Sequence, residues 1–223
     1  MATSPADVRS ILQVVRDDAT AQLTTVARAG DDLRPLLLAV VPELVGGYTE
    51  GSSALAADWY AEIREEARAR HRFVPGQVVD LDAERMRRTV LWATEPIERD
   101  PSAIAEVLAR LTPRAEEEIA RGFWDTIEGN AHRDPEALGW RRDTRPGACA
   151  FCRFLADKGA VYRHDTARFA AHKNCHCVAV PVFKGEDAGP EASALQYVAT
   201  KRRRSPKERA ALRDYLREHY GDN

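Results

Sequence analysis

Residues 4–30 read SPADVRSILQVVRDDATAQLTTVARAG, and this stretch carries a full set of helix signals. Ser4 can cap the helix, Pro5 suits its first position, and Asp7 suits the positive end of the helix dipole. Gly30 is the expected stop. Apolar residues recur at helical spacing and predict one buried stripe, which comprises Val8, Ile11, Leu12, Val15, Ala19, Leu23 and Val26. The stretch therefore predicts a long amphipathic helix.

Helical composition continues from residue 31 to residue 129. In residues 31–72, Pro35, Pro42 and the Gly46–Gly47 pair should interrupt or bend the chain, and residues 53–70 form the most regular helix. Residues 73–76 (FVPG) predict a turn, and a further helix should begin after Asp80. Another helix should begin at the Asp100–Pro101 pair and run to Leu111, and residues 113–127 either continue that helix or form a new one.

The pattern changes after Gly129, where short segments separated by Pro and Gly replace the long amphipathic stretches. Valine-rich and alternating residues predict strands at 139–143 and 177–183. Ser205, followed by Pro206 and Glu208, predicts a short terminal helix. The expected fold is mainly α, with a helical domain at 1–129, a small zinc-binding α+β module at 130–184, and a linker with a basic tail and a short helix at 185–223.

The bulk composition indicates neither a disordered chain nor a membrane protein. Of 223 residues, 44% are hydrophobic and 30% are charged, and no apolar run approaches the roughly 20 residues that span a bilayer. The first residues, MATSPAD, lack the basic and apolar regions of a signal peptide, so we expect synthesis in the cytosol.

The four cysteines are confined to residues 149–177 and lie beside histidines. The CAFC motif at 149–152 brings two thiols onto one turn, and the HKNCHC motif at 172–177 supplies further soft ligands about twenty residues later. Because a reducing cytosol disfavours disulfides, this spacing predicts a structural zinc site. The candidate ligands are Cys149, Cys152, His172, Cys175 and Cys177.

Several arrangements of this cluster stay open. Five candidates compete for four tetrahedral positions; the favoured set is Cys149, Cys152, His172 and one of Cys175 or Cys177, and a four-cysteine site is the alternative. The cysteines could instead form disulfides in an oxidised particle, or be buried small hydrophobic residues without a metal. With protein groups as all four ligands, the zinc would stabilise folding and leave no open position for a catalytic water.

The motifs of this region together resemble one known family. They are GWRR at 139–142, GACAFC at 147–152, GAVY at 159–162, HKNCHC at 172–177 and the Val180–Pro181 pair. They resemble the Mu F-like minor head proteins of tailed phages, in the form found in phages of actinobacteria, and ADWY at 57–60 with Arg64 extends the resemblance toward the N-terminus. In that family an arginine commonly lies between the last two cysteines, whereas this chain has His176.

The resemblance implies a structural minor capsid protein inside the head, made in the host cytoplasm. It implies contact with the portal protein or the major capsid protein, and a role in head morphogenesis and in handling or ejection of packaged DNA. No membrane partner and no small-molecule substrate are expected. The alternative function is a zinc-stabilised nucleic-acid-binding regulator, which the acidic body of the chain disfavours.

The C-terminal residues 201–223 contain eight Lys or Arg against four acids. They could neutralise DNA phosphates without reading sequence, or simply form a solvated tail whose acids pair along the helix. The DNA-contact candidates are Lys201, Arg202, Arg203, Arg204 and Lys207.

The remaining prominent residues predict structure rather than catalysis. Most of the aromatic residues should pack in the core, with one or two available as interface anchors, and Glu116 to Glu118 should form a solvated helix face. The chain lacks a phosphate-binding glycine loop, a Gly-x-Ser-x-Gly elbow and a His-Glu-x-x-His motif, so we expect no enzymatic activity.

Overall fold

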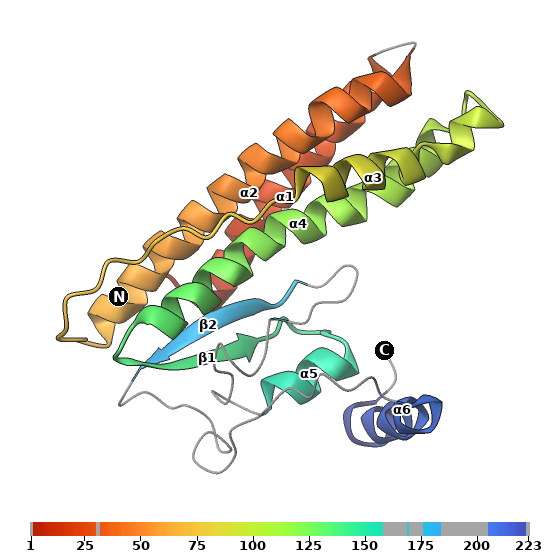
Figure 1. Cartoon of the computed structure of the whole chain (residues 1–223). Helices are drawn as coiled ribbons and strands as arrows, with labels where there is room; N and C mark the ends of the chain where they lie inside the picture. The colour runs from red at the N-terminus through yellow and green to blue at the C-terminus, as the bar shows by residue number, and fades with distance from the viewer. Residues whose placement is uncertain (1, 30–31, 158–168, 170–175, 184–204, 222–223) are drawn as a thin grey trace.

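Long helices form an elongated body, and a two-stranded sheet packs against one end of it (Figure 1). The computed structural model describes residues 2–29, 32–157, 169, 176–183 and 205–221. The predicted mainly α fold is confirmed, with a small sheet formed by residues on either side of the cysteine region. In the described residues, no helix is both long and apolar enough to cross a membrane.

Helix α1 spans Pro5–Arg28 and begins as predicted, because the Ser4 side chain accepts a hydrogen bond from the Asp7 N–H. Its buried stripe differs from the predicted one. Ile11 is 43% exposed and Val15 and Val26 are only partly buried, whereas Arg16 and Ala27 are buried. The stripe therefore contains a charged residue in its middle.

Helix α2 spans Leu33–Glu66 without a break, so the predicted interruption is wrong. Pro35 lies in the first turn, where backbone N–H groups have no helical partner to lose. Pro42 removes one hydrogen bond inside the helix, but it is flanked by Val41 and Val45, which are both fully buried. Packing of these neighbours outweighs the lost bond.

Helices α3 and α4 complete the body. Helix α3 spans Ala83–Ala93 with Asp82 as its cap, and a short 3₁₀ helix, η1, follows at Glu95–Glu98. Helix α4 spans Ile104–Arg133 and continues through Pro113, which selects the first of the two predicted alternatives, although the helix begins a few residues later than expected.

Polar and small residues form a layer across the middle of the body, between two hydrophobic clusters. One cluster lies toward the sheet and the other lies toward the α1–α2 turn. The layer contains the buried polar side chains of Arg16, Thr49, Ser52 and Ser53. Gly122 of α4 lies against α2 here, because a Cβ at this position would stand 2.8 Å from the Thr49 carbonyl oxygen. Close contact between α2 and α4 therefore depends on a glycine.

Residues 73–80 form an extended strap that runs along α2 and α4 toward α3, in place of the predicted turn (Figure 1). Asn130 accepts a hydrogen bond from Gly76 N and donates to Gly76 O, both at 2.9 Å. Thr126 Oγ1 accepts a bond from Val78 N at 2.9 Å. Ser53 Oγ donates to Val78 O at 3.1 Å. Helix side chains thus satisfy the strap backbone in the way that a neighbouring strand would.

We expect Asn130→Ala to lower the free energy of unfolding by about 1–3 kcal/mol, because it leaves the strap N–H and C=O of Gly76 without these partners. Amide hydrogen exchange at Gly76 should accelerate. Gln77→Ala, at an exposed position of the same strap, is the control and should leave both quantities nearly unchanged. Equal exchange in the two variants would contradict the role given to Asn130.

The sheet joins the helical body through a common core. Strand β1 (Ala137–Asp143) and strand β2 (Val178–Phe183) lie where the sequence predicted strands, and they pair antiparallel. Helix α4 extends past the predicted domain boundary at residue 129, and residues of α1, α2, α4, both strands and α5 share one hydrophobic cluster. Trp140 and Phe183 of the strands are almost fully buried in it.

Two further helices, α5 and α6, lie on the side of the sheet that faces away from the helical body (Figure 1). Helix α5 (Ala150–Ala156) begins at the CAFC motif, and helix α6 (Pro206–Tyr220) begins at Ser205 with the predicted capping box. Helix α6 buries none of its residues and contacts α5 through aromatic pairs. In these pairs Phe154 meets Tyr215 and Tyr220 edge to face, with both centroid distances at 5.9 Å.

Candidate functional site

The CAFC motif forms the N-terminal turn of α5. Cys149 caps this helix, and its Sγ accepts a hydrogen bond from the Cys152 N–H at 3.4 Å. Cys152 is buried in the first turn, with 1% of its surface exposed. The structure therefore places these two predicted ligands on one turn, and a helix N-terminus favours the thiolate form that binds metal.

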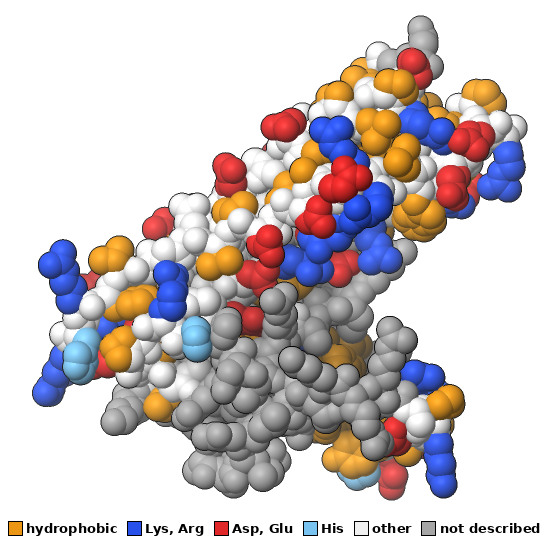
Figure 2. Space-filling model, viewed as in Figure 1, with side chains coloured by type: hydrophobic (Ala, Val, Ile, Leu, Met, Phe, Trp, Pro, Cys, Tyr) orange, Lys and Arg blue, Asp and Glu red, His pale blue; other side chains and the backbone are white. Residues whose placement is uncertain are grey.

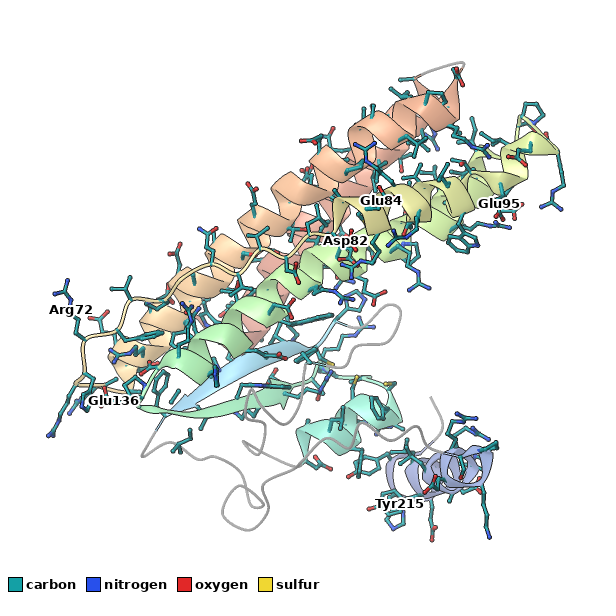
Figure 3. The ribbon with its side chains drawn as sticks, in the orientation of Figure 1. Arg72, Asp82, Glu84, Glu95, Glu136 and Tyr215 are labelled. Carbon is teal, nitrogen blue, oxygen red and sulfur yellow. The ribbon has the colours of Figure 1, made fainter. Side chains whose placement is uncertain are left out.

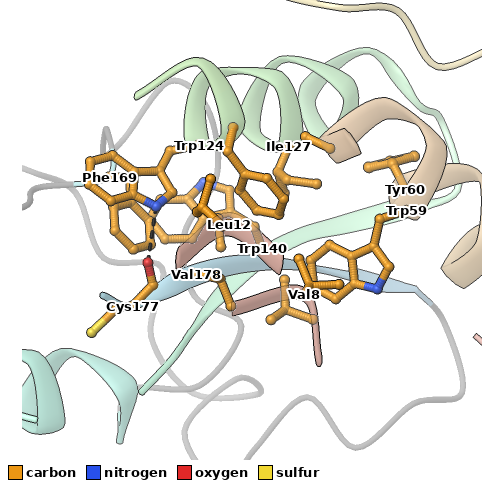
Figure 4. Packing of buried hydrophobic residues seen from close by; sticks show 14 of the residues in the cluster. Val8, Leu12, Trp59, Tyr60, Trp124, Ile127, Trp140, Phe169, Cys177 and Val178 are labelled. Atoms are coloured by element: carbon orange, nitrogen blue, oxygen red, sulfur yellow. Dashed lines mark hydrogen bonds between the residues drawn. The ribbon is translucent and has the colours of Figure 1, made fainter. Parts of the chain in front are cut away.

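Cys177 lies directly before β2 and is anchored by its backbone. Its carbonyl oxygen accepts a hydrogen bond from Trp124 Nε1 at 3.0 Å, and its sulfur points away from the aromatic residues (Figure 4). Trp124 also stacks on Phe169, with ring centroids 4.6 Å apart. The position of Cys177 thus depends on packing between α4 and the start of β2.

Arginines approach the cysteines from two elements. Arg142 of β1 is buried and donates to Cys152 Sγ at 3.7 Å, while its guanidinium lies 3.8 Å from the centroid of the Phe169 ring. Arg9 of α1 forms an ion pair with Asp143. Burial lowers the pKa of Arg9, and the charge of the Cys177 thiolate acts in the opposite direction. Arginines near sulfur stabilise negative charge on it.

The histidine between the last two cysteines contacts α1 rather than serving only as a spare ligand. His176 Nδ1 lies 3.3 Å from Arg16 Nη1, and Arg16 Nη2 lies 3.3 Å from Glu116 Oε2. Arg16 thereby connects the start of β2 with α4 through the polar layer of the body.

The structure brings some of the predicted zinc ligands together and leaves others undescribed. His172 and Cys175 lie outside the described residues. Among the residues that are described, no group of three or more His, Cys, Asp or Glu side chains is placed to hold a metal ion. The zinc-bound module therefore stays a prediction, as do disulfide and metal-free alternatives.

The predicted DNA-contact residues are mostly not described either. Residues 201–204, which comprise Lys201, Arg202, Arg203 and Arg204, lie outside the described part of the chain, and Lys207 is exposed in the first turn of α6. In the same helix Arg217 pairs with Asp214 at 3.2 Å. The acids of α6 thus offset part of its positive charge.

The expected solvated helix face was wrong at Glu118. Glu118 is only 7% exposed, because it packs against the body and accepts a hydrogen bond from Arg85 at 2.5 Å. Burial raises the pKa of Glu118, although Arg121 and Arg85 lower it. Trp92, in contrast, is 44% exposed on α3, where the Arg110 guanidinium lies 5.3 Å from its ring centroid.

Several functional candidates were missed from the sequence. Arg9 and Arg16 belong to no motif, and the GWRR motif at 139–142 gave no role to Arg142; only the folded chain brings these arginines beside the cysteine region. The run RARHR at 68–72 did have a signal, since three of its five residues are arginines.

Comparison with known proteins supplies a family. No curated protein and no solved structure matches the chain significantly. A family model described as VG15 protein matches residues 2–200, which include the helical body and both strands. The chain therefore belongs to the VG15 protein family, a phage-associated family of viral proteins.

Proposed function

We propose that this protein is a structural minor capsid protein of a tailed phage, located inside the head near the portal and acting in head morphogenesis and in handling packaged DNA. The observation that carries the proposal is the VG15 match across residues 2–200. The Mu F-like motifs of the cysteine region support the finer assignment to a minor head protein.

The helical body offers surface for contact with the portal or the capsid. Val14 is 66% exposed on α1, and Leu91 and Trp92 are 45% and 44% exposed on α3. Exposed apolar and aromatic side chains of this kind are typical anchors of protein interfaces. Charged side chains cover much of the visible face of the body, which suits contact with polar partners (Figure 2).

Site-specific photo-cross-linking in assembling heads would test the position near the portal. A photoreactive amino acid at Val14 or Trp92 should capture the portal or major capsid protein, and the same probe at Tyr215 of α6 serves as the comparison. Adducts formed only from Tyr215 would contradict binding through the helical body. Adducts with tail proteins alone would contradict the location inside the head.

We further propose that the cysteine region binds one structural zinc ion. The donor chemistry fits: two cysteines share the N-terminal turn of α5, and the buried Arg142 donates to one of them. The ligand set that we favour is Cys149, Cys152, His172 and one of Cys175 or Cys177. A zinc ion at these residues would connect α5 to the segment that leads into β2, and would stabilise the fold there.

Elemental analysis should find about one zinc per chain in protein purified without chelator. Cys152→Ser should abolish most of this zinc and increase proteolysis around α5 and β2, while most helical circular dichroism remains. Ala150→Ser, in the same turn of α5, is the control and should retain the metal. Zinc near zero in the wild-type protein would overturn this assignment.

A further inference from the structure

The loop that follows α2 presents a dense group of cations at one end of the body. Residues 68–72 read RARHR, and the side chains of Arg68, Arg70, His71 and Arg72 are all exposed. The His71 side chain alone is 71% exposed. Arg68 adopts φ 54°, in the left-handed region, so the chain turns sharply as it leaves the helix. Figure 3 shows Arg72 projecting into solvent.

A network of hydrogen bonds from α2 and from residues 134–136 holds this loop in place. Arg64 contacts Asp134 at 2.7 Å and Glu136 at 3.1 Å, and it also donates to the His71 carbonyl oxygen. Glu136 accepts a bond from His71 N at 2.6 Å. Backbone N–H groups of the loop lower the pKa of Glu136, so the carboxylate remains charged. These contacts therefore fix the backbone of the loop.

Among the described residues, the acids beside the loop pair with Arg64 and His71 rather than with the loop arginines. Asp134 is buried and pairs with Arg64, whereas Glu136 pairs with Arg64 and also lies 3.4 Å from His71 Nδ1. Glu66, at the end of α2, accepts a hydrogen bond from Ala2 N, and thus faces α1. Glu65 and Glu66 are the two exposed acids closest in sequence to the loop. The three loop arginines outnumber these two acids.

A pocket of about 500 Å³ opens between the loop and the start of β1. Its lining includes Arg68, Arg70 and His71 from the loop, and Glu136 and Leu138 from the segment that leads into β1. Arg68 and Arg70 therefore border a concave surface, and Arg72 follows them on the exposed loop.

We propose that Arg68, Arg70 and Arg72 form a second DNA-binding surface, which contacts the phosphate backbone of duplex DNA without reading sequence. Duplex DNA as the partner rests on the proposed function; the cationic surface itself does not. All three cations are arginines, whose planar guanidinium donates two parallel hydrogen bonds to a phosphate. Residues 68–72 supply no exposed aromatic or large aliphatic side chain, and the exposed apolar residue that follows them is Val74, whereas the centre of a protein interface is usually rich in aromatic side chains.

Salt-dependent binding of the full chain to a 30-base-pair duplex would test this surface. We expect Arg68→Gln, Arg70→Gln and Arg72→Gln together to reduce affinity at least about tenfold at low salt, and to lower the slope of log K against log salt by about 2–3. The charge-matched control combines Arg28→Gln, Arg87→Gln and Arg99→Gln, exposed positions outside the loop. That control should keep the wild-type slope.

Equal effects of the two triple variants would overturn the proposal, because binding would then follow only net charge. A variant with Lys201, Arg202, Arg203 and Arg204 changed to Gln provides a third arm, and complete loss of binding there would assign all DNA contact to the tail. If the triple loop variant (Arg68→Gln, Arg70→Gln and Arg72→Gln) loses binding to polyglutamate but retains DNA binding, the loop instead binds an acidic protein. Absence of the chain from purified particles would count against the proposed function alone, since these binding results do not depend on it.

Discussion

Replacing Gly122 with valine should lower the free energy of unfolding by about 3 kcal/mol or more. A Cβ at this position would lie 2.7 Å from Thr49 Cγ2, and 2.8 Å from both Ser53 Oγ and the Thr49 carbonyl oxygen. One of these atoms belongs to the backbone of α2, so side-chain rotation alone cannot remove the clash. The helices would have to separate at the polar layer, where Ser52 Oγ donates to the Ile119 carbonyl oxygen at 2.5 Å.

Urea denaturation monitored by circular dichroism would measure this change. Gly47→Ala is the matched control, since Gly47 also lies within a helix but a Cβ there meets no atom within 4 Å. That substitution should raise stability by about 0.5–1 kcal/mol through helix propensity. If Gly122→Val is as stable as the wild-type protein, the close contact between α2 and α4 is wrong.

Trp124→Ala should lower the free energy of unfolding by about 3–5 kcal/mol. Trp124 is 4% exposed, stacks on Phe169 and donates to the Cys177 carbonyl oxygen. Its loss would leave a cavity between α4 and the sheet and a buried carbonyl group without this donor. The effect should therefore extend to β2, with faster amide exchange in residues 178–183.

Trp92→Ala provides the comparison for a tryptophan outside the core. Trp92 is 44% exposed, and we expect a loss below about 1 kcal/mol. A large loss of stability in Trp124→Ala without faster exchange in β2 would show that the sheet and the helical body do not share one core.

Local signals predicted much of the fold correctly. Ser4 and Ser205 cap helices as expected, because capping depends on residues within one turn. Both strands were predicted, the second from its valine content, and they pair with each other. The long amphipathic stretches gave the mainly helical body. These features need only neighbouring residues to form.

Features that depend on tertiary contacts were predicted less well. Pro42 and Pro113 lie inside continuous helices, since buried neighbours compensate for the missing hydrogen bonds. The strap was expected to turn at residues 73–76, but Thr126 and Asn130, about fifty positions away, hold it extended. Arg16 occupies an apolar stripe because Glu116 and His176 meet it there.

The same difference between local signals and tertiary contacts applies to the candidate sites. Cys149 and Cys152 were predicted from their spacing, and the turn of α5 does bring them together. Arg142 could not be found from the sequence, because its contact with Cys152 requires β1 to lie beside α5. The RARHR run was visible in the sequence, but its importance depends on Asp134 and Glu136 pairing with Arg64 and His71 rather than with the loop arginines.

The content of purified phage particles tests the central claim most directly. Gradient-purified particles would be treated with an external protease, and their proteins would then be quantified by mass spectrometry. The proposed function predicts that peptides of this chain are present in low copy relative to the major capsid protein, and that they survive the protease. Absence of the chain from intact particles, or its removal by the protease, would contradict a minor capsid protein inside the head.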